Sequence, residues 1–376
     1  MVRLTPPMGW NSWNTYGQNI NETLIKETAD CMASSGLADL GYNYLVIDDC
    51  WSLKERDENK RLVADPEKFP NGMKAVADYV HSKGLKFGMY SCAGNLTCAG
   101  YPGSYEHEFI DAQTFAEWGV DFLKYDYCYH SDIVPGEILY RRMGLALENC
   151  GRDILFSACS WGSDETHKWI KTSAASMWRS TGDIFDSWES IKNLTKQQLA
   201  LHPYNGVGCF NDMDMLVVGM YGKGNVGLGG CTDVQYKTHF SIWAFLGSPL
   251  MIGCDIRSMT SEAKSILSNK DMIAINQEPL LRQPYPLKGI WANDDLIMYA
   301  RNLSDGDIAI GLFNLSSEKC VARFNMDELG LPVSLGKTLR MKDIWTQKEA
   351  KVMNGTVMWE LEPYDCAVLR AKLADL

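Results

Sequence analysis

The chain has 376 residues, enough for one barrel of about 250 residues and a smaller second domain. Its composition, 46% hydrophobic and 22% charged, is that of an ordinary globular protein and argues against a disordered chain. The formal net charge of −11 argues against a nucleic-acid surface, because phosphate binding needs clustered Lys and Arg.

Short apolar runs alternate with amphipathic segments through the first three-quarters of the chain. The predicted strands are Pro7–Trp10, Tyr44–Asp48, Lys86–Ser91, Phe122–Tyr125, Ile154–Ser157, Ser176–Trp178, Gly206–Gly208 and Leu250–Ile252. The predicted helices between them are Glu22–Ser35, Gly72–Lys83, Ile110–Trp118, Gly136–Asn149, Trp188–Gln198 and Gln235–Leu246. This alternation indicates βαβ units and a parallel sheet. About eight units favour a (β/α)8 TIM barrel over an open doubly wound sheet, and no Gly-x-Gly-x-x-Gly motif follows the first strand.

From about Ile290 the pattern changes to short alternating runs separated by Asn, Ser, Gly and Asp. These runs are Asp295–Arg301, Asp307–Phe313, Lys319–Phe324, Thr338–Asp343, Ala350–Trp359 and Ala367–Ala371. They predict a C-terminal antiparallel β-sandwich. We therefore expect a barrel domain over residues 1–288 and a sandwich domain over residues 289–376.

Neither a membrane span nor a metal site is predicted. The uncharged run between Lys237 and Asp255 is interrupted by Gly247–Pro249, and we expect a buried helix followed by a buried strand. The twelve cysteines and six histidines show no metal-ligand spacing, so no metal or cofactor is expected. The first residues lack the apolar region of a secretory signal, which predicts a cytoplasmic protein if the chain is full length and a secreted one if a signal was removed.

Carboxylates cluster where the predicted strands end. In a TIM barrel these ends form the active face. The clusters are Val46–Trp51, Leu123–Cys128, Trp178–Asp183 and Phe210–Met215. One Asp after a strand is often only the cap of the next helix. Several clusters with aromatic neighbours favour a sugar site, since aromatic faces cover the C–H patches of a pyranose and carboxylates accept its hydroxyl protons.

Cleavage of a glycosidic bond needs two carboxyl groups with different roles. Lys124 precedes Asp126 by two residues and is expected to lower its pKa, as suits a nucleophile. Asp183 lies in a Gly-containing loop, where desolvation is expected to raise its pKa, as suits an acid. The residues alone do not rank these two above the other strand-end carboxylates.

The sequence resembles glycoside hydrolase family 27, which contains α-galactosidases and α-N-acetylgalactosaminidases. The resemblance runs through most of the chain. Its motifs are Pro7–Trp13, Ile47–Trp51, Gly88–Ser91, Thr97–Ser104, Lys124–Asp126, Trp178–Asp183, Asn211–Leu216 and Pro249–Arg257.

The resemblance implies that Asp126 is the nucleophile and Asp183 the general acid/base. It further implies that Asp48 and Asp49 bind the 4- and 6-hydroxyls of galactose, and that Lys124 binds the 3- and 4-hydroxyls.

Other positions of the site follow from the same resemblance. Arg179 would lie near the sugar's 2-position, and Cys98 and Cys128 would form a disulfide at the rim. Residues implied to line the pocket are Trp13, Tyr90 and Met215. Cys50 matches a cysteine that is often disulfide-bonded, but its usual partner is missing, so we expect a free thiol.

The segment Cys159, Ser160 and Trp161 bears on the choice of sugar. Galactosidases of the family commonly have Glu where Ser160 stands, whereas N-acetylgalactosaminidases have Ser there and Ala where this chain has Ser163. The Gly that follows Trp161 is shared with microbial and plant-like galactosidases. The first prediction is therefore an α-galactosidase and the alternative an α-N-acetylgalactosaminidase.

The predicted ligand is a small molecule or oligosaccharide with a terminal α-galactosyl group, with no nucleic-acid or membrane partner. A non-catalytic galactose-binding protein is a remote alternative, as is another barrel enzyme such as a metal-dependent isomerase or an aldolase. A homo-oligomer is left open.

Overall fold

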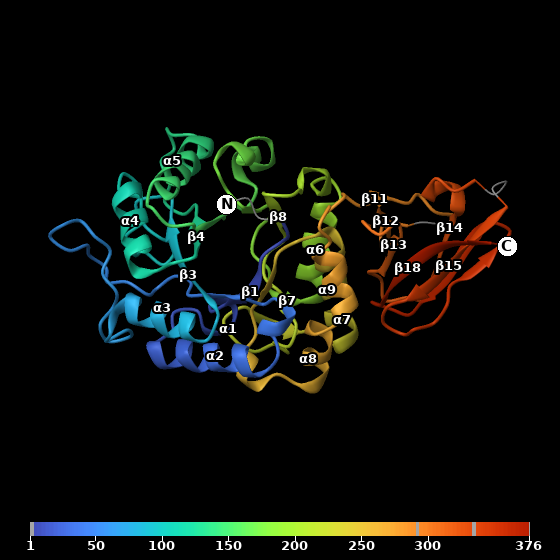
Figure 1. Ribbon diagram of the computed structural model, residues 1–376, viewed down its shortest axis with the longest axis horizontal. Helices are drawn as coiled ribbons and strands as arrows, with labels where there is room; N and C mark the ends of the chain where they lie inside the picture. The colour runs from blue at the N-terminus through green and yellow to red at the C-terminus, as the bar shows by residue number, and fades with distance from the viewer. Residues whose placement is uncertain (1–3, 291–292, 333–335, 376) are drawn as a thin grey trace.

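The structure is a computed structural model that describes residues 4–290, 293–332 and 336–375 (Figure 1). Eight parallel strands form one sheet in the order β10-β1-β2-β3-β4-β5-β6-β8. Their bounds are β1 (Met8–Asn11), β2 (Tyr44–Val46), β3 (Lys86–Cys92), β4 (Phe122–Asp126), β5 (Leu155–Ala158), β6 (Met177–Arg179), β8 (Phe210–Asp212) and β10 (Leu250–Ile252). Leu216, after β8, forms a parallel bridge with Ile252 of β10, so the edges of the sheet meet. The predicted TIM barrel is confirmed.

The predicted seventh strand, Gly206–Gly208, is wrong. Gly206 and Cys209 instead close a turn, in which the N–H of Cys209 donates to the carbonyl of Gly206 at 3.1 Å. Gly208 has φ +87°, a left-handed conformation that does not continue a strand. The strand is β8, four residues later, so Asp212 lies within it rather than after it.

Helices cover the outside of the barrel. They are α2 (Glu22–Ser34), α3 (Gly72–Ser82), α4 (Glu108–Trp118), α5 (Gly136–Glu148), α6 (Trp188–Gln198), α7 (Asp233–Leu246), α8 (Ser261–Leu267) and α9 (Lys270–Asn276). The short helix α1 (Trp13–Tyr16) instead follows β1 at the C-terminal end of that strand. Helix α7 begins two residues before the predicted Gln235, because Thr232 and Gln235 form a capping box. Helices α8 and α9 were not predicted, since seven residues are too few to establish a helical period.

The uncharged run between Lys237 and Asp255 folds, as expected, into a buried helix and a buried strand, which are parts of α7 and β10. Among the residues that the structure describes, no helix has the length and apolar character needed to cross a membrane.

The C-terminal part consists of antiparallel sheets, as predicted. One sheet has the order β11-β12-β13-β18-β15, and another has the order β14-β17-β16. The bounds are β11 (Tyr285–Pro286), β12 (Leu296–Asn302), β13 (Ile308–Asn314), β14 (Cys320–Asn325), β15 (Lys337–Asp343), β16 (Lys351–Met353), β17 (Thr356–Leu361) and β18 (Cys366–Asp375). The run predicted as one strand over Ala350–Trp359 is a hairpin, because Asn354 and Gly355 both have positive φ and form its turn. A small sheet in the barrel part pairs β7 (Asp186–Ser187) with β9 (Gly227–Gly230).

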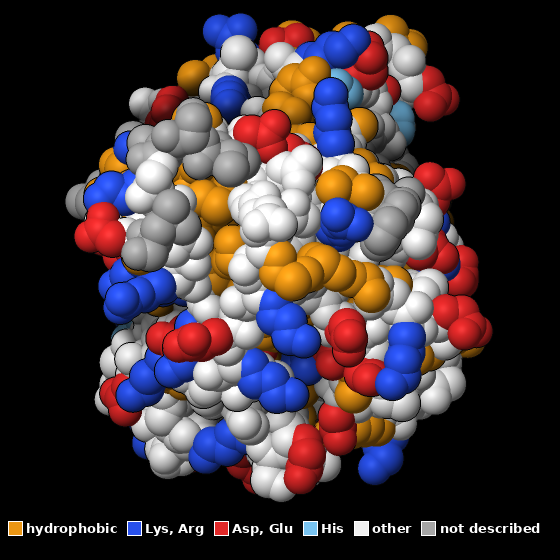
Figure 2. All heavy atoms as spheres, turned by 90° about the vertical axis from the view of Figure 1, so that its right-hand side faces the viewer, with side chains coloured by type: hydrophobic (Ala, Val, Ile, Leu, Met, Phe, Trp, Pro, Cys, Tyr) orange, Lys and Arg blue, Asp and Glu red, His pale blue; other side chains and the backbone are white. Residues whose placement is uncertain are grey.

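The two parts pack directly against each other, with α6, α7 and α9 on the side of the barrel that faces the C-terminal sheets (Figure 1). Arg301 of β12 is fully buried there and donates to the carbonyls of Phe245 at 3.0 Å and Ile275 at 2.6 Å. The opposite end of the C-terminal part carries basic and acidic side chains interspersed on one face (Figure 2). That face is therefore not a uniformly basic surface.

Candidate active site

A cavity of about 290 Å³ opens at the C-terminal ends of the barrel strands. It is lined by Trp13, Asn14, Asp48, Asp49, Tyr90, Cys98, Lys124, Asp126, Cys128, Trp161, Arg179, Asp183, Ile184, Phe185, Asp214, Met215, Asn225 and Val226. All predicted site residues except Cys159 and Ser160 are among them. The cavity is close to the lower limit for small-molecule pockets, which suits a single sugar unit.

Two carboxylates after β2 are held in fixed orientations by neighbouring donors. Asp48 accepts from the Lys124 ammonium at 2.8 Å and from the Asn11 amide at 2.7 Å. Asp49 accepts from the backbone N–H groups of Cys50 at 2.7 Å and Ala99 at 3.0 Å. Burial alone would lower the pKa of Lys124, but Asp48, together with Asp126 and the other acidic groups nearby, outweighs burial and holds that pKa above the usual value. The cluster therefore presents buried charged groups of both signs to a ligand's hydroxyls.

Asp126, the last residue of β4, is 6% exposed. Its carboxylate accepts from the Tyr90 hydroxyl at 3.0 Å and from the N–H of Tyr127 at 2.9 Å. Burial raises the pKa of Asp126 from 3.8 to about 6, and the Lys124 ammonium offsets this only in part. The predicted net lowering is therefore wrong, because the effect of burial is larger than that of the Lys124 ammonium, whose ion pair is with Asp48.

Asp183, in the loop after β6, has a side chain that is 64% exposed. One of its oxygens lies 2.9 Å from a terminal nitrogen of Arg179. Partial burial would raise the pKa of Asp183, but the charge and hydrogen bond of Arg179 outweigh burial and lower it. The predicted rise is therefore wrong, because the guanidinium of Arg179 lies against the carboxylate.

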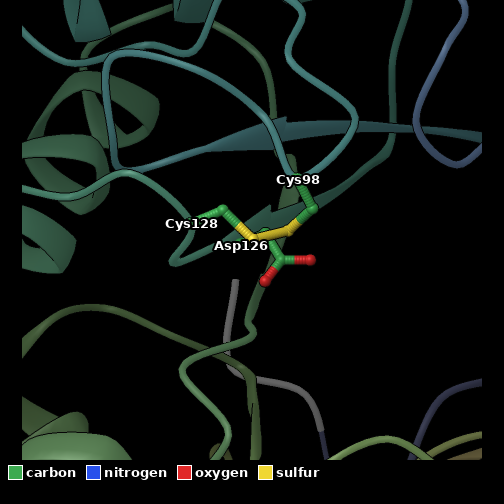
Figure 3. A group of neighbouring side chains, drawn as sticks. All are labelled: Cys98, Asp126 and Cys128. Carbon is green, nitrogen blue, oxygen red and sulfur yellow. A yellow bond between two sulfur atoms is a disulfide. The ribbon is translucent and has the colours of Figure 1, made fainter.

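The loops that follow β3 and β4 are joined by the Cys98–Cys128 disulfide, which the resemblance implied and the structure confirms. Figure 3 shows this bond beside the Asp126 carboxylate. Among the described residues, these three are the one group whose Cys, His, Asp or Glu ligand atoms lie close enough for a metal ion. Both sulfurs are consumed by the disulfide, so the group offers no thiolate. Cys50 is free, as expected.

Reduction of this disulfide is expected to loosen the rim of the cavity. The bond closes a loop with a sequence separation of 30, and such a cross-link contributes roughly 3–4 kcal/mol. We expect dithiothreitol, or Cys98→Ser with Cys128→Ser, to lower the melting temperature and raise KM several-fold. Cys320→Ser, at a free thiol in the C-terminal sheets, serves as the control. An unchanged KM in the fully reduced protein would show that the bond does not shape the site.

In the segment after β5, Trp161 lines the cavity, whereas the two residues before it, Cys159 and Ser160, do not. Ser160 is buried, and its hydroxyl lies 2.6 Å from that of Thr166. Cys159 is also buried, with its sulfur 3.7 Å from a nitrogen of Arg179. Gly162 has φ +83°, and a Cβ there would lie 2.3 Å from the carbonyl oxygen of Ser180. That conformation accounts for Gly at this position.

Several lining residues were missed. Asn225 and Val226 belong to a loop whose backbone N–H groups donate to the carbonyls of Thr15 and Asn14, and no strand end marks such a position. Ile184 and Phe185 follow Asp183 directly. Asp214 lies in the cluster Phe210–Met215, which the sequence shows to contain carboxylates at a strand end. That cluster was a sufficient signal to predict Asp214 as a site residue. These missed lining residues are Asn14, Ile184, Phe185, Asp214, Asn225 and Val226.

Comparison with known families divides the chain into two consecutive parts. Residues 5–278 match the family described as Alpha galactosidase A. Residues 293–371 match the family described as Alpha galactosidase C-terminal beta sandwich domain.

Relatives match over nearly the whole chain. The alpha-galactosidase of Cyamopsis tetragonoloba is 44% identical over 363 residues, which cover 96% of this chain and 85% of the relative. The crystal structure of alpha-galactosidase I from Mortierella vinacea has 35% identity and a TM-score of 0.88, covering 98% of this chain and 97% of that one. The alpha-galactosidase of Saccharomyces cerevisiae with raffinose has 31% identity and a TM-score of 0.88, covering 99% and 98%. The chain therefore belongs to the α-galactosidase family, glycoside hydrolase family 27, and is a glycoside hydrolase.

Proposed function

We propose that the protein is a retaining, exo-acting α-galactosidase that releases terminal α-D-galactose by double displacement. The observation that carries this proposal is that Asp126, at the end of β4, and Asp183, in the loop after β6, line one cavity of single-sugar size. Its small volume supports an exo action, because only the end of a glycan fits such a pocket. The relatives named alpha-galactosidase support the choice of sugar.

In the first step, the Asp126 carboxylate attacks the anomeric carbon while the glycosidic C–O bond breaks. Asp183 donates its proton to the departing oxygen, and an ester between the sugar and Asp126 results. In the second step, Asp183 removes a proton from water as the oxygen of that water attacks the same carbon. The bond between this carbon and Asp126 breaks as the new C–O bond forms, and the two inversions give galactose with its original α configuration.

The other polar groups of the cavity would hold the sugar. We assign the 4- and 6-hydroxyls to Asp48 and Asp49, the 3- and 4-hydroxyls to Lys124, and the region of the 2-position to Arg179. Trp13 would cover an apolar face of the ring. The yeast relative with bound raffinose supports an oligosaccharide carrying a terminal α-galactosyl group as substrate.

We also propose limits for the two domains and a location for the protein. The two family matches end at residue 278 and begin at residue 293, which supports a barrel over 1–288 and a sandwich over 289–376. The Cys98–Cys128 disulfide favours the secreted alternative, since such bonds persist in oxidising compartments.

We expect an acidic pH optimum. The reaction needs one proton on the carboxyl pair, carried by Asp183 and not by Asp126. Because the pKa of Asp126 is raised to about 6 and that of Asp183 is lowered, the single proton resides mainly on Asp126. The reactive state, with the proton on Asp183, is therefore the less populated of the two singly protonated states. Its fraction among these two states does not change with pH. Thus kcat/KM should fall above pH 6, as the last proton leaves, and again at low pH, when both groups are protonated. A basic limb at pH 8 or above would contradict these pKa directions.

The proposal is tested by comparing kcat/KM on the p-nitrophenyl α-galactoside with that on its α-N-acetylgalactosaminide. Ser160 is buried and bonded to Thr166 rather than lining the cavity. We therefore expect the galactoside to be preferred by at least about 100-fold, the scale on which a pocket rejects a group that does not fit. Equal rates, or a preference for the N-acetyl sugar, would replace the proposed activity with that of an α-N-acetylgalactosaminidase.

A further inference from the structure

Asp214 is a buried carboxylate of the cavity for which the proposed mechanism provides no role. It follows β8, is 5% exposed, and has φ +76°, a left-handed conformation that is uncommon outside glycine. Its backbone is held on both sides: its N–H donates to Asp212 at 2.9 Å, and its carbonyl accepts from the Trp243 indole at 2.8 Å. The N–H of Met215 donates to the Asp214 carboxylate at 2.8 Å. The carboxylate is thus rigidly placed before any ligand enters.

This carboxylate contacts both ends of the loop that carries Asp183. One oxygen lies 3.1 Å from a terminal nitrogen of Arg179, the last residue of β6. The other accepts from the N–H of Ile184 at 2.8 Å, one residue after Asp183. Arg179 also donates to the carbonyl of Thr181 at 3.1 Å, inside the same loop. Asp214 therefore fixes the start and the end of a segment of only a few residues.

Asp183 itself has few restraints. Its side chain is largely exposed, and within the described part of the chain its one hydrogen-bond partner is Arg179. Arg179 is 3% exposed and shared between Asp183 and Asp214. Without Asp214, the buried guanidinium would have Asp183 as its remaining carboxylate partner, and the N–H of Ile184 would lose its acceptor. Both changes would move Asp183 relative to the sugar.

We propose that Asp214 is a positioning residue for proton transfer, which holds Arg179 and the 180–184 loop so that the Asp183 carboxyl faces the glycosidic oxygen. This inference rests on the proposed role of Asp183. It requires Asp214 to act through Asp183 and not through contact with the reacting atoms. Its removal should therefore matter most where the leaving group needs a proton.

The test compares Asp214→Asn on two galactosides through kcat/KM, which reports bond cleavage. Methyl α-galactoside has a poor leaving group that needs protonation, and 2,4-dinitrophenyl α-galactoside has a good one that does not. We expect a loss of about 100-fold on the methyl glycoside, the lower end of what general acid catalysis contributes, and less than about 5-fold on the dinitrophenyl one. Equal losses on both would mean that Asp214 merely supports the fold, and the inference would be wrong.

Asp186→Asn is the matched control. Asp186 is also fully buried and accepts two hydrogen bonds, from Gly222 at 2.6 Å and Tyr236 at 2.8 Å, but it does not line the cavity. Its variant should lose stability with no dependence on the leaving group. If Asp214→Asn does not fold, Asp214→Glu keeps the charge but displaces it and should show the same leaving-group dependence. Failure of both variants to fold would make the role structural and refute the inference.

Asp183→Ala, measured in parallel, separates this inference from the proposed function. A leaving-group dependence in Asp183→Ala but not in Asp214→Asn refutes the role of Asp214 alone. Its absence in Asp183→Ala refutes the acid/base assignment on which the inference rests.

Discussion

Replacing Asp126 with Asn is expected to lower kcat on p-nitrophenyl α-galactoside by about 10⁴-fold or more, because the attacking carboxylate is lost. The fold should tolerate the change. The Asn oxygen can accept from the N–H of Tyr127, and its amide can donate to the Tyr90 hydroxyl, so both present contacts persist. Steady-state kinetics and thermal unfolding of the same preparation measure the two effects.

The stability of Asp126→Asn should exceed that of the parent at neutral pH. A folded-state pKa of about 6, raised from 3.8, means that ionised Asp126 disfavours the folded state, by on the order of 3 kcal/mol. This cost is complete above pH 6, shrinks as the pH falls from 6 towards 3.8, and is absent below. The gain in the Asn variant should follow the same course. An equal gain at pH 3 and pH 7 would show that the pKa of Asp126 is not raised.

Asp111→Asn provides the converse control. Asp111 is fully buried outside the cavity and accepts two hydrogen bonds from Arg56, at 2.6 and 2.7 Å. Burial raises the pKa of Asp111 as well, but its replacement should destabilise the protein, since the part-buried Arg56 guanidinium loses its carboxylate partner. Its kcat should stay within a few-fold of the parent. A folded Asp126→Asn with comparable activity would remove Asp126 from the mechanism.

Replacing Asp183 with Ala should lower turnover by about 10²–10⁴-fold, the usual contribution of a general acid/base. Sodium azide should restore activity on an aryl galactoside, because azide attacks the sugar ester without needing a proton removed. Since azide then displaces Asp126, the product should be α-galactosyl azide. In Asp126→Ala, azide would instead replace the nucleophile and give the β-anomer. NMR of the two azide products therefore assigns each carboxylate its role.

Three outcomes of this experiment would contradict the roles assigned to Asp126 and Asp183. An Asp183→Ala variant with unaltered activity, or one that azide does not rescue, would exclude Asp183 as the acid/base. Formation of the β-azide by that variant would exchange the roles of the two residues.

The sequence was sufficient to place Asp48, Asp126 and Asp183 in one site, because parallel barrel strands bring their C-terminal ends to one face. The same logic missed Asn225 and Val226, which reach the cavity through backbone hydrogen bonds to the segment after β1 and not through a strand end. The seventh strand was misplaced because its glycines resembled a strand boundary, whereas the left-handed φ of Gly208 makes a turn.

The pKa directions of Asp126 and Asp183, the two proposed catalytic carboxylates, could not be read from spacing. Lys124 is two residues from Asp126 in the sequence, yet its ammonium pairs with Asp48, 76 residues away. Likewise, four residues separate Asp183 from Arg179, and only the folded loop shows that they form an ion pair. Which charges meet, and how deeply each is buried, are properties of the tertiary structure.

The central claim is that Asp126 forms a covalent bond with the sugar, and mass spectrometry can detect that bond. A fluorinated α-galactosyl fluoride that forms the ester faster than water removes it should add one sugar to the protein. Proteolysis should then locate the sugar on the peptide containing Asp126, as the account predicts. An ester on another carboxylate, Asp183 included, or complete turnover of the reagent with no labelled peptide, would contradict it.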